Sequence, residues 1–381
     1  MTWDWQFPGL SQDNLRWTNK MDIAGRGAAP ARNCAKLVMG AQKIGSQRKM
    51  RVPGIKTARR FLRWIQARIL GGALILAYHR ISTAQGVLQE VPVSPENFSE
   101  HLHELRKHTY PMSLSRLVQD LRHDSLPEKS IAVTFDDGYA DNLYNAKPLL
   151  EKYEIPATVF ICTGYMGNEF WWDELERLIA CSQTDLDTLH LQIGSKEFKW
   201  HPRNTNHESG HAEFRKKFCR SLYHFLLALD PEDQNHAMDT IRSWTAAPPP
   251  ESSSPRAMSS DEILQLVDSG LVEVGAHTSN HPVLPALSFE RQREEIESSK
   301  RDLEALLGNR ISGFAYPNGK ANEHTKRIVQ ELGFAYGCTS LHNVVRPGND
   351  IYELTRFWQK DVDGDRFGKE LNWWMRLGLH R

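Results

Sequence analysis

Two short segments carry side chains that could bind a metal ion and activate water. Asp136 and Asp137 directly follow one short apolar run, and His277 and His281 directly follow another. In parallel α/β folds, functional side chains gather in the loops that follow the C-terminal ends of the strands. One carboxylate and two imidazoles make an open ligand set for a hydrolytic metal, and the second carboxylate can serve as a general base.

The adjacency of the two aspartates has a chemical consequence. Two carboxylates brought close together repel each other, so one of them would hold a proton. A divalent cation bound to one carboxylate removes this conflict and leaves the other ionised as a base. The simpler alternative for Asp136 and Asp137 is a solvated turn before Gly138. For the histidines the simpler alternative is a helix start, and a helix would place His277 and His281 on one face.

At this point the chain resembles the polysaccharide deacetylases with a NodB homology domain (carbohydrate esterase family 4), in their exopolysaccharide-biosynthesis branch. The resemblance covers about residues 73–165 and 258–357. It rests on five motifs in order, which are Leu76-Ala77-Tyr78-His79-Arg80-Ile81, Thr134-Phe135-Asp136-Asp137-Gly138-Tyr139, Ile155-Pro156-Ala157-Thr158-Val159-Phe160, His277-Thr278-Ser279-Asn280-His281-Pro282 and Phe314-Ala315-Tyr316-Pro317-Asn318-Gly319.

The resemblance implies a role for each matching residue. Metal ligation would fall to Asp137, His277 and His281, and Asp136 would be the general base. The backbone N–H of Tyr316 would help to hold the oxyanion. Zinc is the expected metal, with cobalt, nickel and manganese as alternatives.

Two departures from the family pattern concern catalytic helpers. Many members have an arginine that tethers the base where this chain has Phe314, so this tether is expected to be missing. No late Leu-x-His motif supplies a general acid; the segment 354–356 offers Arg356 instead. Members acting on exopolysaccharides take the acid from a histidine in the first strand, and His79 matches that position. The alternative for His79 is a strand-end histidine that only bonds to backbone.

The alternation of apolar strand patterns with helical patterns predicts a parallel sheet. With the resemblance, this becomes an α/β fold, a distorted seven-stranded (β/α) barrel of the NodB homology type with a mainly helical insertion. The expected strands are 74–78, 131–136, 157–162, 272–275, 313–316, 335–339 and 352–356. The expected helices include one capped by Ser94, and others over 114–121, 142–153, 289–307 and 366–379.

Residues 165–257 interrupt this alternation and predict an insertion. A loop of this length inside a compact domain usually forms a lid or subdomain. Because the segment follows a strand, we expect it on the catalytic face. Its aromatic residues Phe170, Trp171 and Trp172 could stack on sugar rings, or they could form a small core of the insertion itself.

The N-terminal part is basic and lacks sustained periodicity. Residues 1–70 hold 14 Lys and Arg against 3 Asp, a net charge of +11, in a chain of zero net charge. We expect residues 1–55 to be a disordered leader and 56–381 to form the barrel. The basic helix expected over 57–70 could dock on an anionic membrane surface or pack across the lower end of the barrel.

The five cysteines have no paired spacing, which argues against a disulfide framework and against a thiolate metal site. No apolar segment has the form of a signal peptide. We therefore expect a cytoplasmic protein with peripheral membrane contact through the 57–70 helix, an acetylated glycan as its partner, and no nucleic acid.

The expected function is metal-dependent removal of N-acetyl groups from an amino sugar, in a polysaccharide or its lipid-linked precursor. Three alternatives stay open at this stage. An O-acetyl esterase could use the same scaffold, since an ester needs less acid assistance. The barrel could be a catalytically silent sugar-binding module. The ligand set alone also fits an iron oxygenase.

Overall fold

The computed structural model describes residues 72–377 except for 84–87, 89–90, 183–188, 201–210 and 252–253. All described residues fall within one compact unit, Pro53–Arg381. The predicted leader over 1–55 and the predicted basic helix over 57–70 lie outside the described residues. Among the described helices, none combines the length and the apolar content that crossing a membrane requires.

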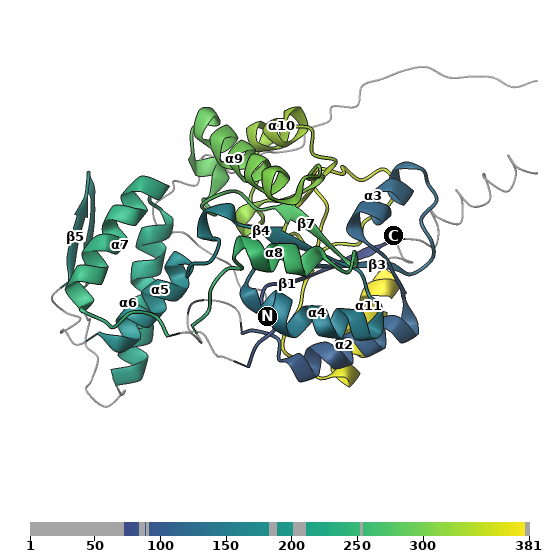
Figure 1. Cartoon of the computed structure of the whole chain (residues 1–381), viewed down its shortest axis with the longest axis horizontal. Coiled ribbons are helices and arrows are strands. Elements are labelled where there is room, and N and C mark those ends of the chain that lie inside the picture. The colour runs from purple at the N-terminus through teal and green to yellow at the C-terminus, as the bar shows by residue number, and fades with distance from the viewer. Residues whose placement is uncertain are drawn as a thin grey trace, which may run out of the picture. The chain divides into compact units, whose positions relative to one another are not determined.

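The centre of the fold is a curled parallel sheet. Its strands run in the order β10-β1-β3-β4-β7-β8-β9, and a two-residue strand, β2, also pairs with β3 (Figure 1). The bounds are β1 Leu74–Tyr78, β2 Tyr110–Pro111, β3 Ser130–Phe135, β4 Ala157–Ile161, β7 Val272–Ala276, β8 Gly313–Ala315, β9 Tyr336–Cys338 and β10 Phe357–Trp358. The predicted seven-stranded barrel of the NodB type is confirmed.

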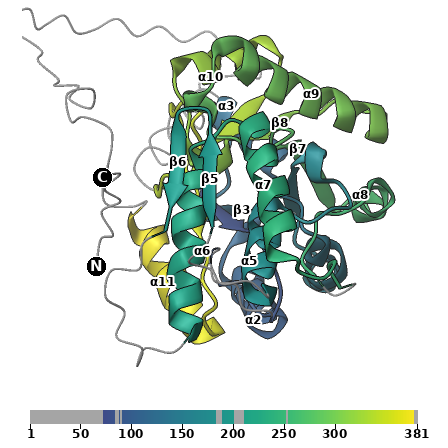
Figure 2. The ribbon, with the colours of Figure 1, turned by 90° about the vertical axis from the view of Figure 1, so that its left-hand side faces the viewer.

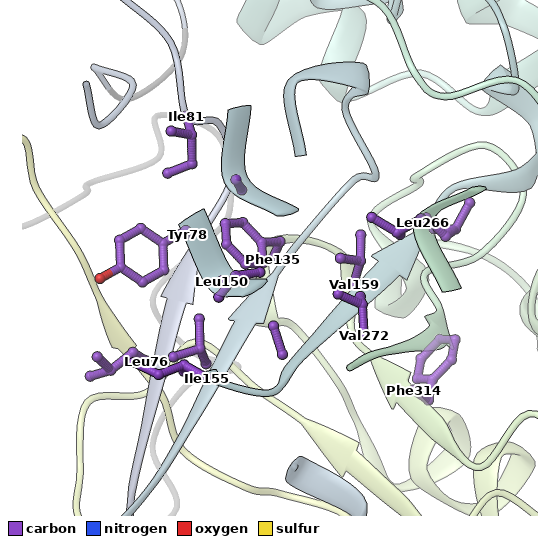
Figure 3. Packing of buried hydrophobic residues seen from close by; sticks show 14 of the residues in the cluster. Leu76, Tyr78, Ile81, Phe135, Leu150, Ile155, Val159, Leu266, Val272 and Phe314 are labelled. Atoms are coloured by element: carbon purple, nitrogen blue, oxygen red, sulfur yellow. The ribbon is translucent and has the colours of Figure 1, made fainter. Parts of the chain in front are cut away.

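Both faces of the sheet are buried, as expected where helices cover a parallel sheet. Along β1, Leu74, Leu76 and Tyr78 pack in the cluster under the outer helices, and Ile75 packs in a second cluster with Phe160. Figure 3 shows the outer cluster from close by. This double burial explains why the strands read as continuous apolar runs, and it fixes the level at which every strand ends.

Helices with clear sequence signals cover the sheet. Ser94 accepts a hydrogen bond from the Asn97 N–H at the start of α2, and Gly308 ends α9 with φ 67°, both as predicted. At the lower end, Ser115 of α3 donates from its N–H and its hydroxyl to Glu273 of β7. The helices are α2 Pro95–His108, α3 Leu114–Arg122, α4 Lys147–Tyr153, α8 Ser260–Val267, α9 Phe289–Leu307, α10 Glu323–Glu331 and α11 Gly364–Leu377.

The insertion folds around a core of its own. It contains α5 Trp171–Cys181, the hairpin of β5 His190–Ile193 and β6 Lys196–Lys199, α6 His211–Leu227 and α7 Pro231–Thr245 (Figures 1 and 2). Phe218, Leu222 and Ile241 are fully buried within it. Phe170, Trp171 and Trp172 belong to the same core at 4% exposure or less, so the sugar-stacking interpretation of these residues is wrong.

The last strand lies later than predicted. The sequence favoured a strand over 352–356, but β10 covers Phe357–Trp358, and Leu354 makes only a single bridge to Cys338 of β9. Between these two contacts the chain turns the fully buried side chain of Arg356 into the fold. The chain changes neighbours here, from Cys338 of β9 at Leu354 to Leu76 of β1 at Phe357.

Candidate metal centre and active site

The end of β3 presents two carboxylates at one mouth of the sheet. The Asp136 N–H donates to the Tyr78 carbonyl at 2.9 Å, which extends the ladder between β1 and β3 by one residue. Asp137 and Gly138 then adopt left-handed conformations with φ 70° and 81°. Because the backbone turns there, neighbouring side chains that would point to opposite faces of a strand both reach the mouth.

Asp136 is held by a buried arginine. The Arg356 guanidinium donates to both carboxylate oxygens, at 2.6 and 2.7 Å, and its Nε donates to the Thr339 carbonyl at 3.0 Å. The arginine that is usual in the third motif is missing, as predicted, but Arg356 supplies a tether for the base from another segment. Phe314 is buried in the core, and the tether comes from Arg356, immediately before β10. A forked, bidentate pair of this kind also fixes the direction of the carboxylate.

The two aspartates differ in charge state. Burial opposes ionisation of Asp136, but the Arg356 guanidinium and His277 outweigh it and lower the pKa of Asp136 to about 2. Burial, together with the negative charges of Asp136 and Asp173, raises the pKa of Asp137 well above its usual range. One carboxylate of the pair is thus ionised and the other holds a proton until a cation replaces it, as the adjacency predicted.

Asp137 lies between the two predicted histidine ligands. Its Oδ1 is 3.5 Å from His277 Nε2 and 3.6 Å from His281 Nε2. This Oδ1 is buried and has no hydrogen-bond partner, which is costly for a carboxylate unless a cation binds there. Ligands sharing one zinc ion stand about 3.4 Å apart. The three side chains therefore fit a divalent metal.

Both histidines are neutral imidazoles that can bind a metal ion. Nδ1 of His277 lies 2.8 Å from the Ala315 carbonyl, which leaves Nε2 free of its proton and facing Asp137. Burial lowers the pKa of His277 to about 4, and burial likewise holds the pKa of His281 well below its usual value. Metal binding at these nitrogens does not have to displace a proton at neutral pH.

The segment from His277 to His281 is a loop, so the interpretation of the pair as one face of a helix is wrong. Thr278 and His281 have φ 63° and 54°, and the His281 N–H donates to Thr278 Oγ1 at 3.0 Å. The Asn280 N–H and side chain both donate to Glu295 of α9. These bonds, rather than helical geometry, bring both imidazoles to the same carboxylate.

Cys162 lies near the same site but is poorly suited to bind a metal. Asp137, Cys162 and His277 offer ligand atoms within 4.8 Å of one another. However, Cys162 Sγ donates to the His277 carbonyl at 3.1 Å, and burial raises the pKa of its thiol well above its usual value. A protonated thiol is a weak ligand. His281, with its neutral imidazole, is the better third ligand.

His79 follows β1 at the same mouth. Its ring stacks on Trp358 at 4.4 Å between centroids. Burial lowers the pKa of His79 to about 4, although the nearby Asp136 carboxylate opposes this shift. The His79 carbonyl accepts from the Asn142 side chain at 2.9 Å, which fixes the backbone at this position. The structure thus brings the predicted acid close to the predicted base, as a neutral imidazole at pH 7.

Tyr316 cannot have its predicted role in the described conformation. Its N–H donates to the Cys338 carbonyl at 3.0 Å, which continues the ladder between β8 and β9. Its side chain is fully buried and its hydroxyl donates to the Tyr352 carbonyl. The prediction that the Tyr316 N–H holds an oxyanion is corrected for this reason, because a donor consumed by the sheet cannot also serve a substrate.

Two aromatic residues contact the candidate site in ways that the sequence analysis did not predict. Trp358 lies between functional groups, with its ring stacked on His79 and the Arg356 guanidinium 5.1 Å from its centroid. Trp172 of the insertion makes an edge contact with His281. Trp358 lies only two residues after Arg356, but no motif marked it, and Trp172 lies more than 100 residues before His281 in the sequence.

Comparisons with known proteins agree with the motifs. The family model "Polysaccharide deacetylase" matches residues 123–183 and 233–337, and the unmatched part between them lies inside the insertion. The Bacillus subtilis (strain 168) protein YxkH, whose name assigns it provisionally to the polysaccharide deacetylases, is 20% identical over 310 residues. That similarity covers 80% of this chain and 78% of YxkH. The predicted family resemblance is confirmed.

Two further similarities support less, because one covers only part of the chain and the other is a likeness of fold. The Staphylococcus aureus (strain MSSA476) poly-beta-1,6-N-acetyl-D-glucosamine N-deacetylase is 28% identical over 150 residues, 36% of this chain and 50% of that protein. The chain thus spans half the length of this relative. The solved structure of IcaB from Ammonifex degensii has a TM-score of 0.52 at 21% identity, covering 80% of this chain and 98% of that one. At this identity the likeness shows the fold.

Proposed function

Given that this chain carries a polysaccharide deacetylase domain, we propose that it is a metal-dependent hydrolase that removes N-acetyl groups from an amino sugar in a polysaccharide or its lipid-linked precursor. The observation that carries the proposal is the buried, unpartnered Oδ1 of Asp137 between two neutral imidazoles. Asp136 lies beside it, ionised and held by Arg356.

In this proposal Asp137, His277 and His281 hold the metal, most simply zinc, with cobalt, nickel or manganese as alternatives. A bound divalent ion would lower the pKa of a water molecule and polarise the acyl carbonyl. Asp136 accepts the proton of the attacking water. Arg356 keeps this carboxylate ionised and aimed at the mouth, at the cost of making it a weaker base.

The leaving nitrogen must gain a proton, because an amine leaves poorly as an anion. His79 is the proposed donor, since its ring lies at the same mouth and near the Asp136 carboxylate. With a pKa of about 4 the resting imidazole is neutral at pH 7, so His79 has to acquire a proton during the reaction before it can donate one. The ionised Asp136, after accepting a proton from water, is the nearest source.

The substrate class is proposed from the kind of relative this chain is similar to. The Staphylococcus aureus relative is named as a deacetylase of poly-beta-1,6-N-acetyl-D-glucosamine. We place the chain in the cytoplasm, with peripheral membrane contact, which favours a glycan precursor. Within the described residues, Cys162, Cys219 and Cys338 are free thiols, as a reducing compartment would keep them.

Product analysis tests the proposal. The purified chain, loaded with zinc, is incubated with N-acetylglucosamine oligomers and with O-acetylated glycans, and acetate and free amines are measured. We expect acetate and amine in equal amounts, and no product from His281→Ala, which loses one of three ligands. A zinc-loaded wild-type chain that binds the oligomers and releases no acetate from any glycan would instead indicate a silent sugar-binding barrel.

The second candidate is O-acetyl ester hydrolysis, which the neutral state of His79 favours. A sugar alkoxide leaves with less acid assistance than an amine does. Under the main proposal, His79→Ala should reduce deacetylation of an N-acetyl sugar by roughly 10²-fold or more and affect an activated aryl acetate much less. Equal losses on both substrates would make His79 a positioning residue, and acetate release without amine would establish the esterase.

A further inference from the structure

The insertion contacts the candidate metal centre through the side chain of Trp172. Trp172 lies in α5, is 2% exposed, and makes an edge contact with the His281 ring at 4.9 Å between centroids and 61° between planes. Tyr139, two residues after Asp137, belongs to the core cluster of the insertion. The ligand loop and the ligand-bearing turn of β3 thus both touch the insertion.

The two histidine ligands are supported in different ways. His277 is buried, follows β7 directly, and has its second nitrogen fixed by the Ala315 carbonyl. His281 sits in a loop at φ 54°, with 14% of its side chain exposed. A residue in a sparsely populated backbone conformation persists only when its surroundings hold it there. His281 therefore depends more on its ring contacts than His277 does.

Trp172 is itself held rigidly. Its Nε1–H donates to the Tyr139 hydroxyl at 2.8 Å, and that hydroxyl donates to Asp173 Oδ2 at 2.7 Å. Phe170 stacks on the indole at 4.7 Å between ring centroids. The Arg80 guanidinium lies over the Tyr139 ring at 4.8 Å. A ring fixed by two hydrogen bonds in series and by stacking can set the orientation of the imidazole it touches.

We propose that Trp172 is a positioning residue for the metal ligand His281, so that the folded insertion completes the metal centre without contributing a ligand. This inference rests on the proposed metal-dependent function. Residues that support a ligand from outside the coordination shell commonly change metal affinity by 10- to 100-fold. Coupling is reciprocal, so a bound metal must stabilise the insertion by the same factor by which the insertion strengthens binding.

The neighbouring tryptophan supplies a matched control. Trp171 lies in the same helix and the same core at 4% exposure, but it stacks on Tyr223 and packs against Trp172 rather than on a ligand. Zinc affinity is measured by competition with a chelator for the wild type, Trp172→Leu and Trp171→Leu, and the visible absorption spectrum is recorded after cobalt loading. Thermal unfolding of each metal-free protein reports the loss of packing alone.

We expect both leucine variants to unfold at lower temperature. Zinc affinity should fall by about 10- to 100-fold in Trp172→Leu, with a changed cobalt spectrum, and by less than about threefold in Trp171→Leu. Equal losses in the two variants, or an unchanged affinity in Trp172→Leu, would overturn the proposal. Should Trp172→Leu not fold, Trp172→Phe and Tyr139→Phe replace it, and an affinity equal to wild type in both would overturn the proposal equally.

Proteolysis gives an independent readout of the reciprocal effect. Zinc should slow tryptic cleavage within the insertion in the wild type and in Trp171→Leu, and should have no such effect in Trp172→Leu. Equal protection by zinc in all three proteins would contradict the coupling. A wild-type chain that binds no zinc would overturn the proposed function as well, whereas normal zinc binding with no difference between the variants would overturn this inference alone.

Discussion

The barrel mouth and the insertion are built by different means. At the mouth, charged groups are placed by backbone: Asp136 continues a strand ladder, and Arg356 is anchored to the Thr339 carbonyl. In the insertion the interior is almost entirely apolar and aromatic, centred on residues such as Phe218 and Trp172. Strand register positions groups more rigidly than a small aromatic core can, which explains why the candidate ligands all come from the barrel.

The two regions also differ in how their interiors affect stability. A buried ion pair such as Asp136–Arg356 loses the hydration of two charges and repays this only while both partners are present. An apolar core loses stability gradually as side chains are trimmed. Changes at the mouth should therefore be severe and specific to chemistry, and changes in the insertion should be graded and mainly structural.

The largest effect on chemistry is expected from Asp136→Asn. The amide keeps the shape of the carboxylate but cannot accept a proton, so turnover should fall by roughly 10² to 10⁴. Zinc affinity should stay near that of the wild type, because Asp137 and not Asp136 faces the histidines. Chelator competition beside the acetate assay separates the two properties. Loss of both zinc binding and turnover would show that Asp136 is a metal ligand. The two aspartates would then not have separate roles.

Arg356→Met should have the largest effect on stability. It leaves the Asp136 carboxylate buried without its partner, a change that commonly costs about 3–5 kcal/mol in the free energy of unfolding. Urea denaturation at pH 7 measures this.

The pH dependence of that loss checks its cause. With Arg356 present the folded-state pKa of Asp136 is about 2, below the ordinary value of 3.8, so its stabilisation is complete above 3.8 and is lost as the pH falls toward 2. In Arg356→Met the guanidinium no longer opposes burial, so this pKa is higher than in the wild type and the destabilisation should shrink on acidification from pH 7. A loss independent of pH would point to packing alone.

Metal affinity should depend on pH through Asp137. The pKa of this carboxyl is raised, so below that pKa zinc must displace its proton, and affinity should increase about tenfold per pH unit and then level off above it. His277, with a pKa of about 4, adds no second proton above about pH 5. Competition titrations from pH 5 to 8 measure the slope. A dependence of zinc affinity on pH that corresponds to two displaced protons would show that a histidine is also protonated.

The smallest effect on the site is expected from trimming the insertion core away from Trp172. Leu222→Ala removes a fully buried side chain and should cost about 2–5 kcal/mol of unfolding free energy in that region. While the insertion remains folded, zinc affinity should stay within about twofold, since the change leaves the contact between Trp172 and His281 in place. Hydrogen exchange measures the stability of the insertion, and chelator competition measures the zinc affinity. A tenfold loss of affinity would mean that the whole core, and not one contact, supports the ligand loop.

The parts of the site that depend on short sequence patterns could be predicted, and the parts that depend on contacts between distant segments could not. Asp137 and His277 could be recognised because they lie at the ends of apolar strand patterns, with His281 four residues beyond His277, and parallel strands end at one face. The Arg356 tether could not be recognised. Arg356 lies 220 residues from Asp136 along the chain. Its segment also reads as an ordinary strand, so neither spacing nor periodicity relates the two residues.

Local patterns likewise misled where tertiary contacts prevailed. The spacing of four between His277 and His281 suits a helix. The segment is instead a loop, in which Asn280 donates hydrogen bonds to Glu295 of α9. The oxyanion role implied for Tyr316 was lost because its N–H completes a ladder with Cys338. In each case the competing partner comes from another element.

The sequence by itself determined the parallel sheet, the placement of the candidate ligands near strand ends and the resemblance to the polysaccharide deacetylases, because these depend on hydropathy over a few residues and on short motifs. Only the tertiary structure decided which cation holds Asp136, which of two carboxylates is protonated, and where the insertion touches the ligand loop. The physical reason is that pKa values and side-chain orientation depend on burial and on charges a few ångströms away in space. Parallel crossovers bring together residues that are far apart along the chain.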